Sequence, residues 1–171
     1  MHRLSDVVAV RGDGDGRLLE ARMWLPLARD DVFPFFADAM NLESITPGWL
    51  RFSVVTPQPI VMAAGAEIEY RLRLHGVPLR WRTLIAAWQP PHRFVDSQIS
   101  GPYARWVHEH RFSEAAGGVV VADRVSYRIR GGSLIDRIGN AALAERDLIR
   151  IFDHRQRALR SLLLAAPIIE V

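Results

Sequence analysis

Apolar and polar residues alternate through the middle of the chain. In residues 67–74 every second position is apolar, and mainly charged residues fill the positions between them. A second alternating run covers residues 79–88, after the turn-forming sequence His-Gly-Val-Pro at 75–78. Alternation with a period of two places one face of a strand in the core and the other in water. These two runs therefore predict an antiparallel hairpin with one buried face.

Further strands are predicted on both sides of this hairpin. Runs rich in β-branched and aromatic residues recur at hairpin spacing and are separated by Gly, Pro and Ser. The predicted strands cover residues 18–25, 50–56, 67–74, 79–88, 93–100, 104–112 and 119–127. Two short helices, at residues 30–39 and 40–49, are predicted after the first strand. The pattern indicates one antiparallel sheet of about seven strands.

After Gly131-Gly132 the apolar period changes from two residues to about 3.6, which is typical of an amphipathic helix. Ser133 is a suitable N-cap for this helix. The predicted buried stripe comprises Ile135, Ile138, Ala142, Glu145, Ile149, Phe152, Gln156, Leu159 and Leu163. Such a stripe has to pack against something, and the sheet supplies a large apolar face. The sequence therefore predicts an α+β fold, a curved antiparallel sheet wrapped around one long C-terminal helix.

Three polar residues interrupt or border the helical stripe. Glu145 and Gln156 lie on it, and Arg155 lies beside it. These side chains reach water or a local partner at the helix margin, or they line a polar part of a cavity. The sequence leaves both interpretations open.

A polar cluster is predicted on an otherwise apolar wall. Alternation places Trp106, His108 and His110 on one face of their strand. If residues 113–118 close a hairpin, Asp123 lies opposite His108 or His110 on that same face. A core rarely accepts several polar groups unless they satisfy one another, so this wall suits a ligand cavity.

Composition removes several kinds of chemistry. The chain has no cysteine, and all 22 residues counted as Lys+Arg are arginine, so thiol and lysine catalysis are excluded. The net charge is only +3 and the arginines are spread along the chain, which argues against nucleic-acid binding. His108, His110 and Asp123 alone do not specify a metal site. We therefore predict no metal and no cofactor.

The termini carry no recognisable targeting segment. The apolar run at residues 7–10 is too short for a signal core, and a cytoplasmic protein is expected. We predict a flexible segment at 1–17, one domain at 18–166 and a tail at 167–171. No stable membrane insertion is expected. The oligomeric state, monomer or homodimer, stays open, although an edge strand at 18–25 could pair with a second copy.

Several ordered motifs resemble the SRPBCC superfamily, which includes START-like and Bet v 1-like proteins. They are residues 88–96 (WQPPHRFVD), 101–103 (GPY), 106–112 (WVHEHRF), 123–127 (DRVSY) and 151–155 (IFDHR). Within the superfamily, the chain is most similar to bacterial ligand-binding proteins of the polyketide cyclase/dehydrase and lipid transport group. The resemblance covers residues 18–164 and implies the helix-grip fold, with a deep apolar cavity between helix and sheet.

Two functions are compatible with these observations. The first is a carrier or sensor that encloses a small hydrophobic molecule, lipid-like or aromatic and polyketide-like. The second is a cofactor-independent cyclase or dehydratase, a lyase in which His108 or His110 is the general base, Asp123 orients the imidazole and Tyr127 polarises a carbonyl. Alternatively, the His–Asp pair has no role in catalysis and is only a hydrogen bond between buried polar side chains. The expected ligand-binding residues are Tyr70, Trp81, Phe94, Trp106, His108, His110, Val125, Tyr127, Glu145, Ile149 and Phe152.

Overall fold

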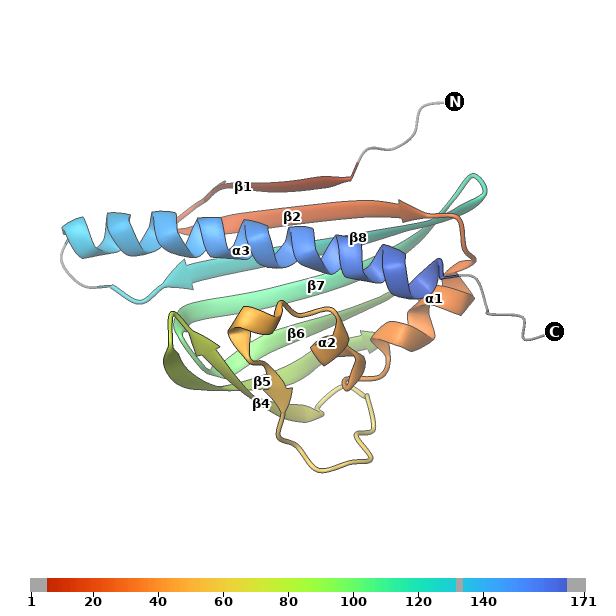
Figure 1. Ribbon diagram of the computed structural model, residues 1–171, viewed down its shortest axis with the longest axis horizontal. Coiled ribbons are helices and arrows are strands. Elements are labelled where there is room, and N and C mark those ends of the chain that lie inside the picture. Colours follow the sequence, from red (N-terminus) through yellow and green to blue (C-terminus); the bar gives the residue numbers. More distant parts are fainter. Residues whose placement is uncertain (1–5, 132–133, 166–171) are drawn as a thin grey trace.

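The chain forms one large antiparallel sheet that curves around a long helix (Figure 1). In the computed structural model, which describes residues 6–131 and 134–165, the sheet has eight strands in the order β1-β2-β8-β7-β6-β5-β4-β3. The strands are β1 Val7–Asp13, β2 Gly16–Leu25, β3 Ser53–Val54, β4 Glu67–Leu74, β5 Val77–Gln89, β6 Arg93–Ser100, β7 Tyr103–Ala115 and β8 Gly118–Ile129. The predicted α+β helix-grip fold is confirmed.

One strand lies in a segment for which the sequence predicted flexibility. Residues 7–13 form β1, which pairs with β2 from Val7 opposite Arg22 to Asp13 opposite Gly16. Val8 and Val10 on β1 are half-buried and pack against a core cluster beneath the C-terminal helix, which explains why this short run is ordered. The flexible segment was therefore wrong for these residues, and β1 is the sheet edge in place of residues 18–25. Residues 1–5 and the predicted tail 167–171 lie outside the described chain.

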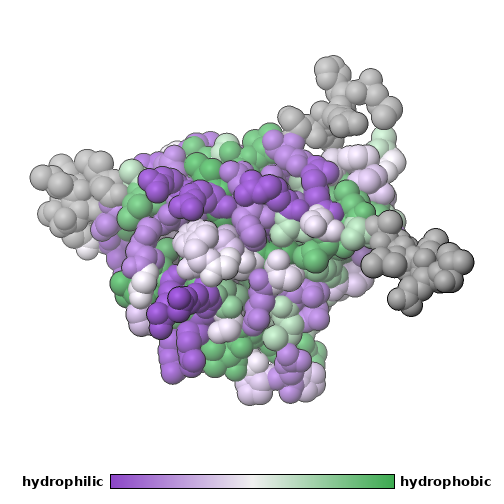
Figure 2. Space-filling view, in the orientation of Figure 1, coloured by the Kyte–Doolittle hydropathy of each residue, from purple (hydrophilic) through white to green (hydrophobic). Residues whose placement is uncertain are grey.

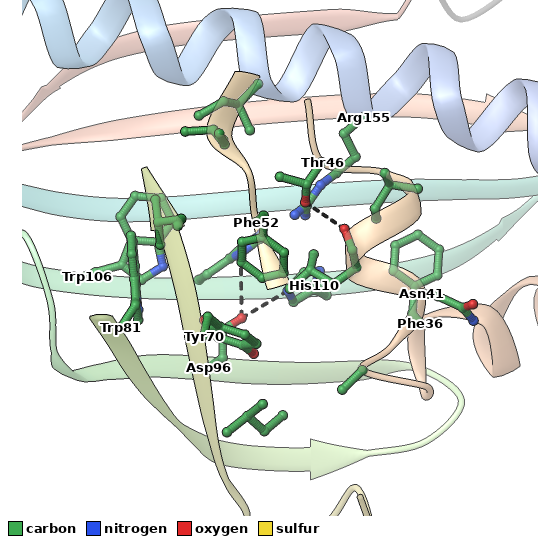
Figure 3. A pocket seen from close by; sticks show the side chains of 18 of the residues that line it. Phe36, Asn41, Thr46, Phe52, Tyr70, Trp81, Asp96, Trp106, His110 and Arg155 are labelled. Atoms are coloured by element: carbon green, nitrogen blue, oxygen red, sulfur yellow. Dashed lines mark hydrogen bonds and ion pairs between the residues drawn. The ribbon is translucent and has the colours of Figure 1, made fainter. Parts of the chain in front are cut away.

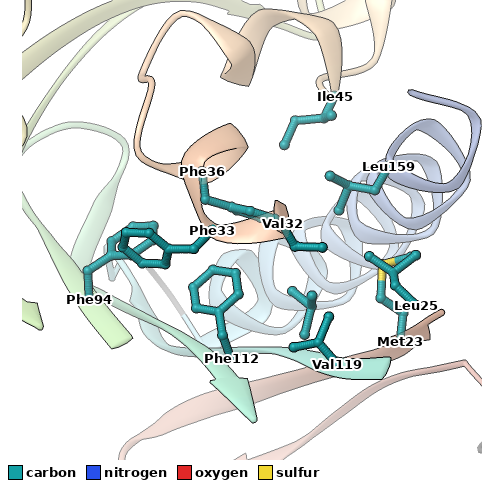
Figure 4. Close-up of a cluster of buried hydrophobic side chains, with 11 residues drawn as sticks. Met23, Leu25, Val32, Phe33, Phe36, Ile45, Phe94, Phe112, Val119 and Leu159 are labelled. Carbon is teal, nitrogen blue, oxygen red and sulfur yellow. The ribbon is translucent and has the colours of Figure 1, made fainter. Parts of the chain in front are cut away.

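Two short helices and a 3₁₀ turn connect β2 to β3. They are α1 Arg29–Phe36, α2 Asn41–Ser44 and η1 Gly48–Leu50, so the helices predicted at 30–39 and 40–49 are present but shorter. The strand predicted at 50–56 is reduced to the two residues of β3. Phe33 and Phe36 of α1 pack against Phe112 of β7, with ring centroids 5.2 and 4.9 Å apart, and this cluster closes one end of the sheet (Figure 4).

The long helix α3, Leu134–Leu163, crosses the concave face of the sheet along β2 and β8 (Figure 1). Hydrophilic side chains cover its outward side (Figure 2). Leu148, Arg155 and Leu159 are buried, whereas Ala142 is exposed and Ile149 is only half-buried. Phe152, Gln156 and Leu159 of the predicted stripe are buried as expected, so the stripe is confirmed in part, and the buried face extends beyond it to Leu148 and Arg155. The predicted N-cap Ser133 and the side chains of Ile135 and Ile138 lie outside the described part of the structure.

Polar contacts fix one flank of α3 against the first two strands. Nε2 of Gln156 donates to the carbonyl oxygens of Val7, at 3.3 Å, and Arg22, at 3.0 Å. Glu145 forms an ion pair with Arg17 of β2. On the other flank of α3, the buried Asp147 contacts Nε2 of His75, in the turn between β4 and β5, at 2.7 Å. In residues 6–131 and 134–165, no helix combines the length and apolar character that crossing a bilayer requires.

Candidate functional site

A cavity of about 190 Å³ lies between the concave face of the sheet, α3 and the segment that carries α1, α2 and η1 (Figure 3). α3 covers the β2 and β8 side of the sheet, whereas α2 and η1 lie over the β4 to β6 side (Figure 1). The two coverings separate over the middle of the sheet, and the cavity occupies that space. Its wall is mainly aromatic and aliphatic. Its charged and polar side chains come from β6 and β7, from α3 and from the connecting segment, and include Asp96, His108, His110, Arg155, Asp38, Asn41 and Thr46.

Most of the residues that the sequence nominated as ligand-binding line this cavity. They are Tyr70, Trp81, Phe94, Trp106, His108, His110 and Phe152. All but Phe152 come from inward-facing positions of β4, β5, β6 and β7, where strand alternation is a reliable guide. Trp106 and Phe152 also share a packed cluster at the α3 side, so the cavity extends from them toward β4 and not along β8.

The other four nominated residues lie away from the cavity. Val125 and Tyr127 of β8 are fully buried directly beneath α3, where helix and sheet are in contact. Glu145 pairs with Arg17 at the helix margin, and Ile149 lies on the flank of α3 outside the cavity wall. Burial raises the pKa of Tyr127 to about 12, and within the described residues its hydroxyl has no hydrogen-bond partner.

Sequence reasoning missed Asp96 and left the place of Arg155 open. Asp96 lies on β6 two positions after Phe94 and therefore on the same face of that strand, a signal that alternation alone supplies. Arg155 was expected either at the helix margin or in a polar part of a cavity, and the structure places it in the cavity wall. Apolar lining residues from the connecting segment were also missed, among them Phe35, Phe36, Leu42, Phe52 and Met62.

The cavity floor carries a compact cluster of two histidines and two aspartates. The strand register aligns Asp96 of β6 with His108, and His110 with Asp123 of β8, on one face of the sheet. Nε2 of His108 donates to Oδ1 of Asp123 at 2.9 Å, and Nε2 of His110 lies 3.1 Å from Oδ2 of Asp96. Nδ1 of His110 is 3.0 Å from Asp123 without hydrogen-bond alignment, and Nδ1 of His108 is 3.5 Å from Asp96. Each of the four ring nitrogens therefore faces a carboxylate.

These contacts separate the pKa values of the two imidazoles. Burial, together with the charge of neighbouring His110, lowers the pKa of His108. Burial also opposes the charge of His110, but the nearby carboxylate of Asp123 and the hydrogen bond to Asp96 outweigh burial and raise its pKa. For Asp123, burial is outweighed by the hydrogen bond from His108 and the proximity of His110, which hold its pKa well below the usual range. The contacts thus favour ionised aspartates and shift the pKa values of the two histidines in opposite directions.

Arg155 adds a permanent positive charge beside the cluster. It extends from α3 into the cavity toward His110 (Figure 3), and its Nη1 lies 3.7 Å from Oδ1 of Asp123. It is therefore the nearest fixed counter-charge to a buried carboxylate. Of the three polar residues on or beside the predicted stripe, only Arg155 lines the cavity, because Glu145 and Gln156 are engaged at the margin with β1 and β2.

The cluster could also hold a divalent metal ion. One ligand atom each from Asp96, His108 and His110 lies within 4.8 Å of the others, and two imidazoles with one carboxylate are a donor set that transition metals accept. An ion there would have to displace the proton of His110 and the hydrogen bonds to Asp96. The prediction of no metal rested on Asp123 as the third donor and overlooked Asp96.

Comparison with known proteins agrees with this geometry. Residues 25–148 match the family model described as polyketide cyclase / dehydrase and lipid transport. The chain belongs to this family. It is accordingly a member of the SRPBCC superfamily, as the motifs of the sequence suggested. A search of curated proteins found no match.

Solved structures share the fold at low sequence identity. Protein Ms6760 from Mycobacterium smegmatis is 17% identical, and the match covers 92% of this chain and 96% of that one with a TM-score of 0.59. TTHA0849 from Thermus thermophilus is 17% identical over 88% and 99% of the two chains, with a TM-score of 0.65. Ara h 8.0201 is 13% identical over 92% and 100%, with a TM-score of 0.59. At these identities the likeness establishes the fold alone.

Proposed function

We propose that this protein binds a small, mainly apolar molecule in the cavity beneath α3 and acts as a carrier or sensor of that molecule. The observation that carries the proposal is a space of about 190 Å³ walled by aromatic and aliphatic side chains, with a few convergent polar groups on its floor. This is the usual composition of a small-molecule site, in which apolar area supplies affinity and polar groups fix orientation. The family description, which includes lipid transport, is consistent with it.

The volume limits the size of the enclosed part of the ligand. An apolar cavity of about 150 Å³ is large enough for benzene. The 190 Å³ here therefore suits a substituted single ring or a short alkyl chain. The aromatic walls of Trp81 and Trp106, whose rings meet edge to face at 5.0 Å, favour a flat or slender molecule.

The alternative is a cyclase or dehydratase that works in the same cavity. It is favoured by one observation, the placement of His108, His110 and Asp96 together in the wall of the cavity. Turnover would then fall in His108→Gln and His110→Gln variants that still bind ligand, whereas a carrier has no turnover to lose. Tyr127 has no part in either function, because it lies beneath α3 and not in the cavity wall.

Native mass spectrometry of the purified protein tests the proposal directly. We expect a bound mass that denaturation releases, and extraction followed by identification should return an apolar molecule. A ligand-free protein that also shows no thermal shift with single-ring aromatics and medium-chain alkyl compounds would contradict it. For comparison, a ligand at one hundred times its dissociation constant stabilises the native state by about 2.7 kcal/mol.

A pair of tryptophan variants on α3 locates the binding site. Ile151 lines the cavity, so Ile151→Trp should fill part of it and abolish the thermal shift given by apolar probes. Ala142 is exposed on the same helix, and Ala142→Trp serves as the matched control that keeps the shift. Equal shifts in the two variants would place binding outside this cavity.

A further inference from the structure

Arg155 is a buried cation whose hydrogen-bonding capacity is unused. Its side chain is 9% exposed, and its Nε and Nη1 find no hydrogen-bond partner among residues 6–131 and 134–165. The guanidinium carbon lies 4.9 Å from the centre of the Phe152 ring, a contact that accommodates the charge but satisfies no N–H group. Buried donors without acceptors are rare in folded proteins, and each one calls for an explanation.

The nearby carboxylates do not supply that explanation. Asp123 is the nearest, at 3.7 Å from Nη1, which exceeds the length of a hydrogen bond. Its Oδ1 already accepts from His108, and His110 lies against the same oxygen. The second carboxylate, Asp96, is engaged by His110. The donors of Arg155 therefore remain available to a group that enters the cavity.

Local charge does not repel an anion from this position. Both histidines lie against the two aspartates, and Arg155 adds a permanent positive charge beside Asp123. An oxyanion placed at Arg155 on the side away from Asp123 meets a cation in an environment of low dielectric constant. Charge-assisted hydrogen bonds are about twice as strong as neutral ones, and the planar guanidinium matches two oxygens of one carboxylate.

The cavity has an apolar side and a charged side. Trp81 and Trp106 lie at one side of the close-up view, whereas Arg155 enters from α3 at another, near Thr46 (Figure 3). Leu148 and Ile151, which precede Arg155 on the same face of α3, continue the apolar wall up to the guanidinium. This distribution fits a molecule with an apolar body and one polar end.

We propose that the molecule bound in this cavity carries a carboxylate, or a planar oxyanion of the same shape, and that Arg155 binds it through its unpaired N–H groups. This assignment rests on the proposed function, since it names the chemical class of the same ligand. It makes Arg155 a specificity-determining residue that distinguishes apolar acids from neutral molecules of equal size.

Isothermal titration calorimetry at pH 7 with matched acids and amides tests the assignment. The probes are 4-ethylbenzoate against 4-ethylbenzamide, and octanoate against octanamide, which differ within each pair in charge and little in shape. For at least one pair, we expect the dissociation constant of the acid for the wild-type protein to be lower than that of the amide by a factor of about ten or more. Arg155→Met should reduce that preference to less than about twofold and leave binding of the amide nearly unchanged.

Two further variants separate a local contact from a general effect of charge. Arg150 is exposed on the same helix and stacks over Trp49, so Arg150→Met removes the same charge outside the cavity and should keep the preference. Arg155→Lys keeps the charge without the planar fork and should retain only part of the preference. Circular dichroism of each variant verifies its fold. If Arg155→Met does not fold, the preference for acid over amide is compared between the wild type and Arg155→Lys. A smaller preference in Arg155→Lys then supports the role of Arg155, and an equal one contradicts it.

The outcomes distinguish failure of this assignment from failure of the proposed function. Equal wild-type affinities for acid and amide overturn the carboxylate assignment and leave apolar ligand binding intact. A preference that survives in Arg155→Met overturns the role of Arg155. If none of the four probes binds, the carboxylate assignment is overturned as well. The native mass spectrum of the purified protein then decides whether the cavity binds any ligand.

Discussion

Replacing Asp123 with alanine tests how the cavity floor is held together. The carboxylate is 6% exposed and faces three positively charged or proton-donating groups, His108 at 2.9 Å, His110 at 3.0 Å and Arg155 at 3.7 Å. Asp123→Ala leaves these groups buried with Asp96 as the only carboxylate of the cluster. Because Asp123 is the carboxylate nearest to Arg155, the variant leaves this buried cation without its closest counter-charge.

The size of the effect follows from that charge. Removing one partner of a buried ion pair costs about 3–5 kcal/mol, because the remaining charge is desolvated and unpaired. His110 can release its proton, which limits the loss, so we expect the free energy of unfolding to fall by about 3 kcal/mol at pH 7. Asp123→Asn keeps the shape and one acceptor for His108, and it should cost about 1–3 kcal/mol.

Urea unfolding followed by circular dichroism measures these changes, provided that the slope of free energy against urea stays constant. Glu67→Ala is the control, since its ion pair with Arg82 is about half exposed and should contribute less than about 1 kcal/mol. The double variant Asp123→Ala/Arg155→Met removes one charge of each sign and should lose less stability than the two single variants combined. If Asp123→Ala costs less than about 1 kcal/mol, or the two changes are additive, the interpretation as a coupled cluster is refuted.

Two further predictions concern pH and the sheet. The pKa of His110 is raised in the folded state, so its stabilisation is complete below the unfolded pKa of about 6.5 and is lost as pH rises through the folded value. Unfolding free energy should therefore decline above pH 6.5 in the wild type and decline less in His110→Gln, and equal slopes in urea titrations would contradict this. A Cβ on Gly118 would lie 2.0 Å from the carbonyl oxygen of Leu25, so Gly118→Ala should destabilise by about 1–3 kcal/mol, whereas Gly12→Ala, with open space around it, should not. Equal melting temperatures for these two variants would disprove the close approach of β8 to β2.

The sequence predicted the strands of the cavity floor well because their faces are determined by alternation alone. Trp106, His108 and His110 occupy inward positions of β7, and a one-residue error there would have moved every side chain to the other face. The pairing of β7 with β8 was constrained in the same way by a short hairpin at Ala115 opposite Gly118. These features depend on local sequence, so a single chain suffices to infer them.

The rotation of α3 could not be predicted with the same certainty. A helical period of 3.6 allows two overlapping stripes, one through Ile149 and Gln156 and another through Leu148 and Arg155. Hydropathy favours neither strongly, because each contains a polar residue. The buried face includes residues of both stripes, because Gln156 donates to the carbonyls of Val7 and Arg22 while Leu148 and Arg155 line the cavity. The contact with Val7 depends on β1, which the sequence did not reveal.

Asp96 illustrates a different limit. Its inward orientation follows from its distance of two residues from Phe94, but its partner histidine depends on the register of β6 against β7, and no tight turn fixes that register. The chain between them, residues 101–102, adopts bends and the pairing begins only at Ser97 opposite Val107. Candidate residues on a strand can thus be identified from alternation, whereas their assembly into a cluster requires the structure.

The arrangement of the four ring nitrogens bears on whether the cavity binds or transforms its ligand. A general base needs a lone pair directed at the proton that it removes. In His108, Nε2 is engaged by Asp123, whereas Nδ1 lies 3.5 Å from Asp96 without a hydrogen bond. Asp96 is the more exposed of the two carboxylates, at 17% against 6%, and it lines the cavity. The two groups of the cluster that could act on a ligand as a base are therefore Nδ1 of His108 and the carboxylate of Asp96, and His108→Gln and Asp96→Asn variants separate their contributions.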